Sequence, residues 1–173
     1  MDIAYTMTRG ARDLDPLLAD VAQVLLAEGL RVVGIVQVNQ DRDDGARCDM
    51  DAVVLPDGPK IRISQSLGPA ARGCRLDPAG LERAVGETQA RLAQADLLIL
   101  NKFGKQEVAG RGMRPLIAEA VARGVPVLTG VNSLNLEGLQ AFAEGIAVEV
   151  MPDVDALAAW LRAAHDRATA SAP

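Results

Sequence analysis

The sequence contains few aromatic residues, one histidine and two cysteines. Aromatic side chains make up only 2% of its 173 residues, so its core must be built mainly from Ala, Val, Leu and Ile. The single histidine, His165, excludes a site made of several imidazoles. Two cysteines, Cys48 and Cys74, are too few for a disulfide-stapled scaffold and are typical of a protein from a reducing compartment.

The sequence also lacks an excess of positive charge and a long apolar run. A net charge of -5 argues against general nucleic-acid binding, because a phosphate backbone requires a basic surface. No apolar stretch is long enough for a membrane helix, and the first residues lack the basic and apolar regions of a signal peptide. We therefore expect a cytoplasmic protein without membrane insertion. Whether it forms a homo-oligomer is left open.

Apolar strands alternate with amphipathic helices along most of the chain. Asp15-Pro16 and Asp77-Pro78 predict helix starts, because Asp accepts hydrogen bonds at the N-cap and Pro suits the first helical position. The expected parallel strands are residues 3–6, 31–38, 97–100, 125–129 and 146–150. This order predicts one three-layer α/β domain over residues 1–167, with a mostly parallel sheet flanked by helices. Residues 168–173 are expected to be a flexible C-terminal tail.

An antiparallel hairpin is predicted at about residues 50–65, around the turn Pro56-Asp57-Gly58-Pro59. It could extend the sheet at one edge or cover the strand ends as a lid. Its two ends would bring Cys48 close to Cys74. Two thiols there could bind a soft metal, or one thiolate beside an arginine could be reactive. Alternatively, both cysteines pack as small apolar side chains.

The run from Leu97 to Leu100 predicts a strand at the centre of the sheet, buried on both faces. A polar loop is expected to follow it. Ligands of open α/β sheets bind outside the carboxyl ends of the strands. The loop therefore supplies candidate residues for an anion or a nucleotide, although it could also be an ordinary solvated loop. The candidates are Asn101, Lys102, Lys105 and Glu107.

Two further loops have the composition of an anion site. Arg9, Gly10 and Arg12 lie between the first strand and its helix, where helix N–H groups attract anions. The pattern G-x-x-x-x-G-K-[ST] is absent there, and Asp13 would repel an anion. Either loop could serve only to turn the chain. The second loop contributes Ser64, Ser66, Arg72, Gly73 and Arg75.

The segment from Asp96 to Val131 resembles the small P-loop nucleoside triphosphatases of the thermophilic type. The resemblance implies a P-loop NTPase-like fold and a nucleotide with Mg²⁺ as ligand. Asn101-Lys102 stands where that family has an acidic pair, and residues 8–12 lack its lysine, so that Glu107 is the one remaining acid. We therefore expect the fold to carry over and the hydrolysis to be lost. The residues that carry the resemblance are Asp96-Leu97-Leu98-Ile99-Leu100, Gly104-Lys105, Glu107 and Gly124-Val125-Pro126-Val127-Leu128.

Nearly the whole chain is similar to a bacterial family of unknown function. The shared segments are Cys48-Asp49-Met50, Ile63-Ser64-Gln65-Ser66-Leu67-Gly68 and Gly73-Cys74-Arg75-Leu76-Asp77. Members often occur beside molybdate-uptake genes, which implies a role near molybdenum handling. Molybdate and tungstate are tetrahedral dianions, and basic side chains suit such ligands. Those available are Arg9, Arg12, Lys102 and Lys105.

Three hypotheses follow. The first is a binding protein for a small oxyanion or a nucleotide phosphate, on a degenerate P-loop-like fold. The second is a nucleoside triphosphatase with a non-standard phosphate loop, which would depend on Glu107. The third is a protein-interaction or regulatory module that retains a vestigial site.

Overall fold

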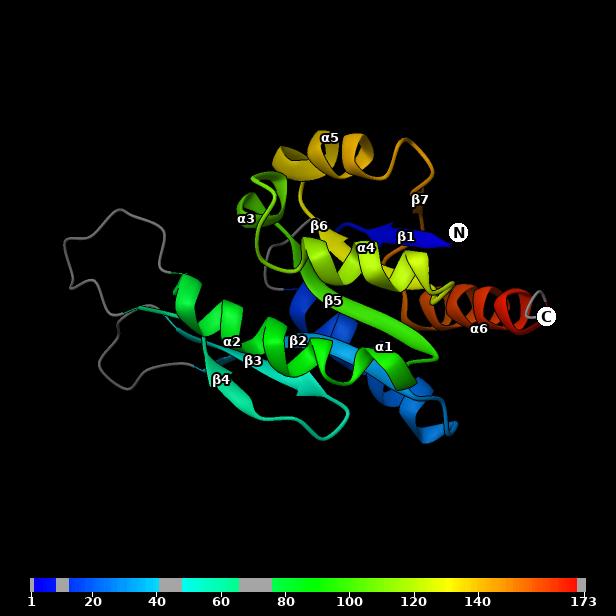
Figure 1. Cartoon of the computed structure of the whole chain (residues 1–173), viewed down its shortest axis with the longest axis horizontal. Coiled ribbons are helices and arrows are strands. Elements are labelled where there is room, and N and C mark those ends of the chain that lie inside the picture. Colours follow the sequence, from blue (N-terminus) through cyan, green and yellow to red (C-terminus); the bar gives the residue numbers. More distant parts are fainter. Residues whose placement is uncertain (1, 9–12, 41–47, 66–75, 171–173) are drawn as a thin grey trace.

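In the computed structural model, a seven-stranded sheet lies between two layers of helices (Figure 1). The structure describes residues 2–8, 13–40, 48–65 and 76–170. The strands are β1 (Ile3–Thr6), β2 (Val32–Gln40), β3 (Asp49–Leu55), β4 (Lys60–Arg62), β5 (Leu97–Phe103), β6 (Val127–Val131) and β7 (Val148–Glu149). The helices are α1 (Leu14–Ala27), α2 (Pro78–Gln89), the 3-10 helix η1 (Leu92–Gln94), α3 (Lys105–Val108), α4 (Arg114–Ala122), α5 (Ser133–Phe142) and α6 (Val154–Ala170).

The strand order is β4-β3-β2-β5-β6-β1-β7. The pairs β2–β5, β5–β6, β6–β1 and β1–β7 are parallel, whereas β3 is antiparallel to both β2 and β4. The predicted mostly parallel sheet is therefore confirmed. The predicted hairpin, formed by β3 and β4, extends the sheet at one edge and is not a lid over the strand ends.

Two apolar cores lie on opposite faces of the sheet. On one face α1 and α6 pack against the sheet through residues such as Leu18 and Leu161. On the other face α2, α4 and α5 contribute Leu81, Leu116 and Leu139. Alternate residues of the buried strands point to opposite faces and supply both cores. The three-layer α/β prediction is thus confirmed. None of the helices in the described ranges is long and apolar enough to cross a membrane.

Two predicted helix starts with the same Asp-Pro sequence differ in the structure. Asp77 caps α2 as predicted, because its side chain accepts a hydrogen bond from the backbone N–H of Ala79 at 3.0 Å. The prediction that Asp15 caps α1 is wrong. Asp13 occupies the N-cap, and Asp15 lies in the first helical turn with its side chain buried. The helix begins earlier because Leu14 packs over Gly130, where a Cβ atom would lie 2.5 Å from a Leu14 methyl carbon.

Several predicted boundaries also shift. The central strand β5 continues to Phe103, so Asn101 and Lys102 belong to the strand and not to a loop. Lys105 and Glu107 lie on the one-turn helix α3. The strand predicted over residues 31–38 continues as β2 to Gln40. The last helix, α6, continues to Ala170, three residues into the predicted tail.

Candidate functional site

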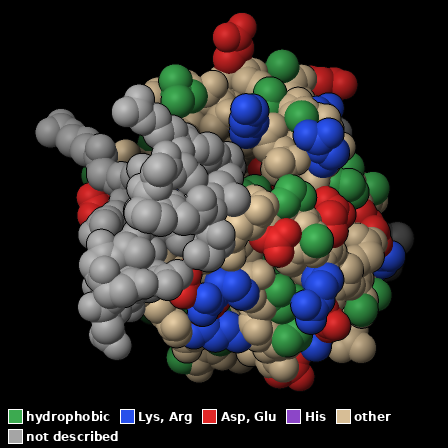
Figure 2. All heavy atoms as spheres, turned by 90° about the vertical axis from the view of Figure 1, so that its left-hand side faces the viewer, with side chains coloured by type: hydrophobic (Ala, Val, Ile, Leu, Met, Phe, Trp, Pro, Cys, Tyr) green, Lys and Arg blue, Asp and Glu red, His purple; other side chains and the backbone are tan. Residues whose placement is uncertain are grey.

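The carboxyl ends of β1, β2, β5 and β6 meet at one edge of the sheet, which we call the carboxyl edge. The strand directions also bring the start of α1 and the start of β3 to this edge. Figure 2 shows this side of the molecule, where basic and acidic side chains of the described residues are interspersed. Some predicted site residues belong to the ranges 9–12 and 66–75, which lie outside the described residues, and they stay predictions. They are Arg9, Gly10, Arg12, Ser66, Arg72, Gly73, Cys74 and Arg75.

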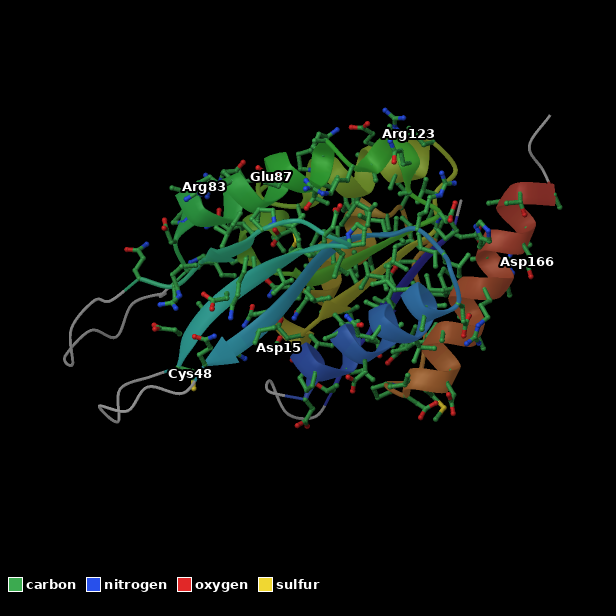
Figure 3. All side chains as sticks on the ribbon, turned by 90° about the horizontal axis from the view of Figure 1, so that it is seen from below. Asp15, Cys48, Arg83, Glu87, Arg123 and Asp166 are labelled. Carbon is green, nitrogen blue, oxygen red and sulfur yellow. The ribbon has the colours of Figure 1, made fainter. Side chains whose placement is uncertain are left out.

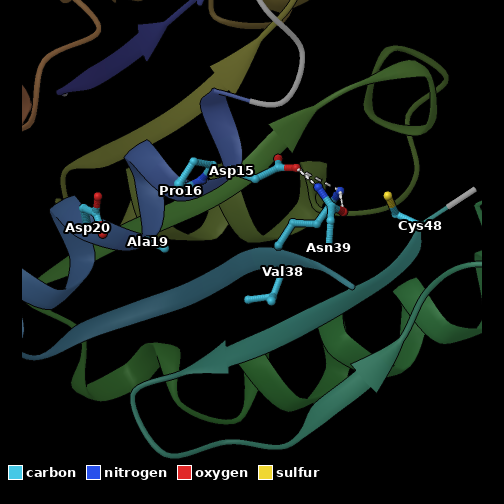
Figure 4. A pocket seen from close by; sticks show the side chains of 8 residues that line it. Asp15, Pro16, Ala19, Asp20, Val38, Asn39 and Cys48 are labelled. Carbon is cyan, nitrogen blue, oxygen red and sulfur yellow. Dashed lines mark hydrogen bonds between the residues drawn. The ribbon is translucent and has the colours of Figure 1, made fainter. Parts of the chain in front are cut away.

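The centre of the carboxyl edge is a buried carboxylate, Asp15, which is only 4% exposed. Three side-chain amides donate hydrogen bonds to it. Asn101 Nδ2 lies 2.8 Å from Asp15 Oδ1, and the amide nitrogens of Gln37 and Asn39 lie 3.2 and 2.5 Å from Oδ2. Figure 3 shows Asp15 at the start of α1, and Figure 4 shows its contacts with the amides of β2. These contacts join α1 to β2 and β5 at the point where each faces the edge.

The carboxylate fixes the orientation of the amides around it. An ionised carboxylate only accepts hydrogen bonds, so each amide must turn its N–H group toward Asp15 and its oxygen away. As a result, Asn101 Oδ1 is buried and has no hydrogen-bond partner among the described residues. A buried polar atom without a partner costs about 1–3 kcal/mol. This unmatched acceptor therefore indicates a place for a ligand or a water molecule.

A second unpartnered polar atom lies at the end of β1. Thr6 is fully buried, and its Oγ1 has no hydrogen-bond partner in the described part of the chain. Thr6 pairs with Gly130 of β6, and β6 lies between β1 and β5. Because Ala4 packs in the core under α1, the period of two turns Thr6 to the same face. Thr6 therefore faces the start of α1 from the sheet, and Asp15 belongs to the first turn of that helix.

Two lysines, one in β5 and one in α3, belong to the same edge of the sheet. Lys102 follows Asn101 in β5 and is half-buried, and Lys105 is exposed in the single turn of α3. Both are therefore delivered to the carboxyl edge, as the sequence predicts. Their positive charge and the N-terminus of the 14-residue helix α1 are the features of this edge that favour an anion.

The contacts of Glu107 indicate a structural role. Its side chain is 3% exposed, and its two oxygens accept hydrogen bonds from the backbone N–H groups of Gly104 and Met113, each at 2.9 Å. These donors are the N-caps of α3 and α4, so one carboxylate holds two helix starts together. Burial raises the pKa of Glu107, while the two N–H donors act to lower it. Gly112 is packed so closely against this carboxylate that a Cβ atom would overlap Oε1.

Ser64 joins the two ends of the edge hairpin. Its Oγ accepts a hydrogen bond from the backbone N–H of Met50 at 3.0 Å and donates to Asp49 Oδ1 at 3.4 Å. Ser64 also forms an isolated β-bridge with Leu76.

Cys48, just before β3, is half-buried. Within the described ranges, no group of three or more His, Cys, Asp or Glu residues could hold a metal ion.

An open pocket of about 430 Å³ lies beside the buried carboxylate, between α1 and the ends of β2 and β3 (Figure 4). We call it the α1–β2 pocket. It is bounded by eight side chains, some apolar and some polar. They are Asp15, Pro16, Ala19, Asp20, Gln37, Val38, Asn39 and Cys48.

Comparison with known protein families identifies the chain. The family described as "Protein of unknown function (DUF2478)" matches residues 3–160. The chain belongs to this family. The family assignment spans β1 to α6, so it includes the whole carboxyl edge described above.

A curated relative of this DUF2478 chain comes from Bradyrhizobium diazoefficiens and is named molybdenum import ATP-binding protein ModC 2. The two sequences are 42% identical over 166 residues, which is 95% of this chain but only 18% of the relative. The chain thus spans about a fifth of the length of that protein. The resemblance to a family near molybdate-uptake genes therefore agrees with the name of this relative.

Among solved structures, the solution structure of a human cancer-related nucleoside triphosphatase is similar to this DUF2478 chain. The TM-score is 0.60, at 17% sequence identity, and the match covers 100% of both chains. At this identity the likeness shows the fold alone. The expected P-loop NTPase-like α/β fold is thereby confirmed.

Magnesium, which the fold implies, is poorly matched by the described residues. Mg²⁺ is usually held in proteins by one or two carboxylates and by phosphate oxygens. Asn101 offers a neutral oxygen, and the carboxylate beside it, Asp15, already accepts three amide N–H groups. Glu107 is engaged by two backbone N–H groups. Neither of these two buried carboxylates is therefore available for the metal.

Little in the sequence marks Thr6 or the amides of β2 as site residues. A threonine at the end of a short apolar strand is common, and nothing nearby marks Thr6 as unpartnered. Gln37 and Asn39 stand two residues apart at the end of a strand, which is a weak sign that they share a direction. The role of Asp15 was obscured because the adjacent Pro16 made an N-cap the simpler interpretation.

Proposed function

We propose that this chain is an accessory domain for molybdenum import that binds a nucleotide phosphate or a small oxyanion at its carboxyl edge without hydrolysing it. The observation that carries the proposal is the buried, unpartnered hydroxyl of Thr6 at the end of β1, which can donate a hydrogen bond to an anion at the N-terminus of α1. A folded chain retains such a group at a cost, and a bound ligand would remove that cost.

The anion would be held by groups that donate hydrogen bonds. The described donors at this edge are the Thr6 hydroxyl, the N–H groups of the first turn of α1 and the ammonium group of Lys102 or Lys105. The predicted contributions of Arg9, Gly10 and Arg12 would come from the segment between β1 and α1. A nucleotide phosphate, molybdate and tungstate share the tetrahedral oxyanion that these donors suit.

The absence of hydrolysis is proposed from the state of the acidic side chains. A triphosphatase needs a group that orients or deprotonates the attacking water. Glu107 was the sequence candidate for that role, but both of its oxygens accept backbone hydrogen bonds. Asp15 is enclosed by three amides. Neither carboxylate has the exposed, unengaged oxygen that a general base requires.

A role in molybdenum import is supported by the relative from Bradyrhizobium. There, a segment 42% identical to this chain forms 18% of a protein named for molybdenum import and ATP binding. Two domains joined in one protein commonly act together when they occur as separate chains. We therefore propose that this domain senses a ligand and reports its presence to an import ATPase. The proposal thus combines ligand binding with the hypothesis of a regulatory module.

The proposal is tested by ligand-dependent thermal unfolding and by a phosphate-release assay on the purified protein. The ligands are ATP, ADP, GMP, AMP, phosphate, sulfate, molybdate and tungstate, with and without Mg²⁺. A ligand at a hundredfold excess over its Kd should add about 2.7 kcal/mol of stability. We expect at least one ligand to stabilise the protein, no release of phosphate from ATP, and loss of the stabilisation in Thr6→Val. Stabilisation by none of them, or turnover of ATP, would contradict the proposal.

A further inference from the structure

The α1–β2 pocket contains hydrogen-bond acceptors that lack donors. The amide N–H groups of Gln37 and Asn39 that could have faced it are turned onto Asp15. Asn39 Oδ1 already accepts a hydrogen bond from Gln37 Nε2 at 2.8 Å, whereas Gln37 Oε1 accepts none within the described ranges. The carboxylate of Asp20, which also lines the pocket, has no partner in the described part of the chain. Gln37 Oε1 and the Asp20 carboxylate are thus the oxygens of the pocket that need donors.

This arrangement makes the pocket a poor site for an oxyanion. Molybdate and phosphate would place negative oxygens beside the carboxylate of Asp20, which has no donor in the described part of the chain, and this is electrostatically unfavourable. Asp15 repels them less because three amide N–H groups offset its charge. A group with several N–H donors is matched instead. Apolar walls at Pro16, Ala19 and Val38 suit a flat ring, and a volume of about 430 Å³ lies in the usual range for small-molecule sites.

The pocket and the proposed anion site share one helix turn. Asp15 belongs to the first turn of α1, and its other side faces the pocket. Asp20 lies five residues further, about 7.5 Å along the helix axis at 1.5 Å per residue. A ligand with an anionic end and a donor-bearing ring could therefore lie along the start of α1. A nucleotide has this combination of groups, whereas a free oxyanion does not.

We infer that the α1–β2 pocket binds the base of a nucleotide and that it prefers guanine. This inference rests on the proposed function, which puts the phosphate at the N-terminus of α1. A carboxylate accepts two parallel N–H groups, and guanine offers them side by side at N1 and its 2-amino group. Adenine presents a ring acceptor next to its amino group, which a carboxylate repels. Asp20 is then the residue that determines base specificity.

The test is a calorimetric titration of the full chain with four probes: GMP, AMP, guanosine and inorganic phosphate. Asp20→Asn removes the carboxylate from the pocket. Asp166→Asn, on the exposed side of α6 far from the pocket, is the control with the same change of charge (Figure 3). Ala19→Leu narrows the pocket with a residue that favours helix. Circular dichroism checks that each variant is folded.

We expect GMP to bind more tightly than AMP, with a preference of about tenfold. Asp20→Asn should abolish the preference and Ala19→Leu should weaken both nucleotides, while phosphate binding stays unchanged in both variants. Asp166→Asn should behave as the wild type. Equal affinity for GMP, AMP and phosphate would overturn the base pocket but leave the proposed function standing. Guanosine binding without phosphate binding would support the pocket and contradict the proposed anion site. No binding of any probe would overturn both.

Discussion

The Thr6→Val substitution should stabilise the protein in the absence of ligand. Thr6 is fully buried in β1, and its Oγ1 has no hydrogen-bond partner among the described residues. Valine keeps the branched shape and replaces the hydroxyl by a methyl group. A buried unsatisfied polar group costs about 1–3 kcal/mol, so removing it should raise the free energy of unfolding by about 1 kcal/mol. For a chain of this size that corresponds to a Tm increase of about 2–4 °C.

Thr129→Val is the matched control. Thr129 is also fully buried in a strand, but its Oγ1 donates a hydrogen bond to the backbone oxygen of Leu100 at 3.0 Å. Losing a satisfied hydrogen bond should lower the free energy of unfolding by about 1 kcal/mol. The two variants should therefore differ by about 2 kcal/mol in equilibrium urea unfolding. An equal loss of stability in both would mean that the Thr6 hydroxyl is satisfied, and the argument for a ligand beside it would fail.

The remaining predictions concern the rest of the edge and the core. Glu107→Gln replaces one acceptor of a backbone N–H group and should cost about 1–3 kcal/mol in urea unfolding. The pKa of Glu107 is raised in the folded state, so the wild type gains stability relative to this variant as the pH falls from the folded pKa toward about 4.3; unfolding free energies that differ by a constant amount across pH 4–8 would contradict this. Gly34→Ala should cost about 3 kcal/mol or more or prevent folding, because Gly34 has a φ of 150° and an added Cβ would overlap the backbone oxygen of Ile99 in the neighbouring strand; near-wild-type expression and Tm would refute it. Asp96→Asn removes the ion pair with the exposed guanidinium of Arg31 but keeps an acceptor for the backbone N–H of Arg31, so it should cost less than about 1 kcal/mol; a larger loss in thermal unfolding would show that the pair is not merely a surface contact.

Local sequence patterns predict the layers of this fold well because the interactions that form each helix or strand are between neighbouring residues of one segment. The apolar run of β5 is buried on both faces, as a central parallel strand requires. Asp77-Pro78 begins α2 because the Asp side chain caps the backbone of its own first turn. In both cases, residues within one segment decide the outcome.

The candidate site could be predicted only in part because its contacts are long-range. Asp15 has the same Pro neighbour as Asp77, but it accepts hydrogen bonds from residues that are 22, 24 and 86 positions away. These donors draw the side chain inward and change its role from a cap to a buried centre. Likewise, Asn101 can lie inside a buried strand because Asp15 accepts its N–H group. No local pattern contains that information.

The measurement that tests the central claim most directly is a calorimetric titration of wild type and Thr6→Val with GMP, AMP, phosphate and molybdate. The account predicts that the wild type binds at least one of these ligands and that Thr6→Val, although more stable, binds it at least about tenfold more weakly. Equal binding by the two proteins, or no binding of any ligand to the wild type, would contradict a ligand site at the carboxyl edge.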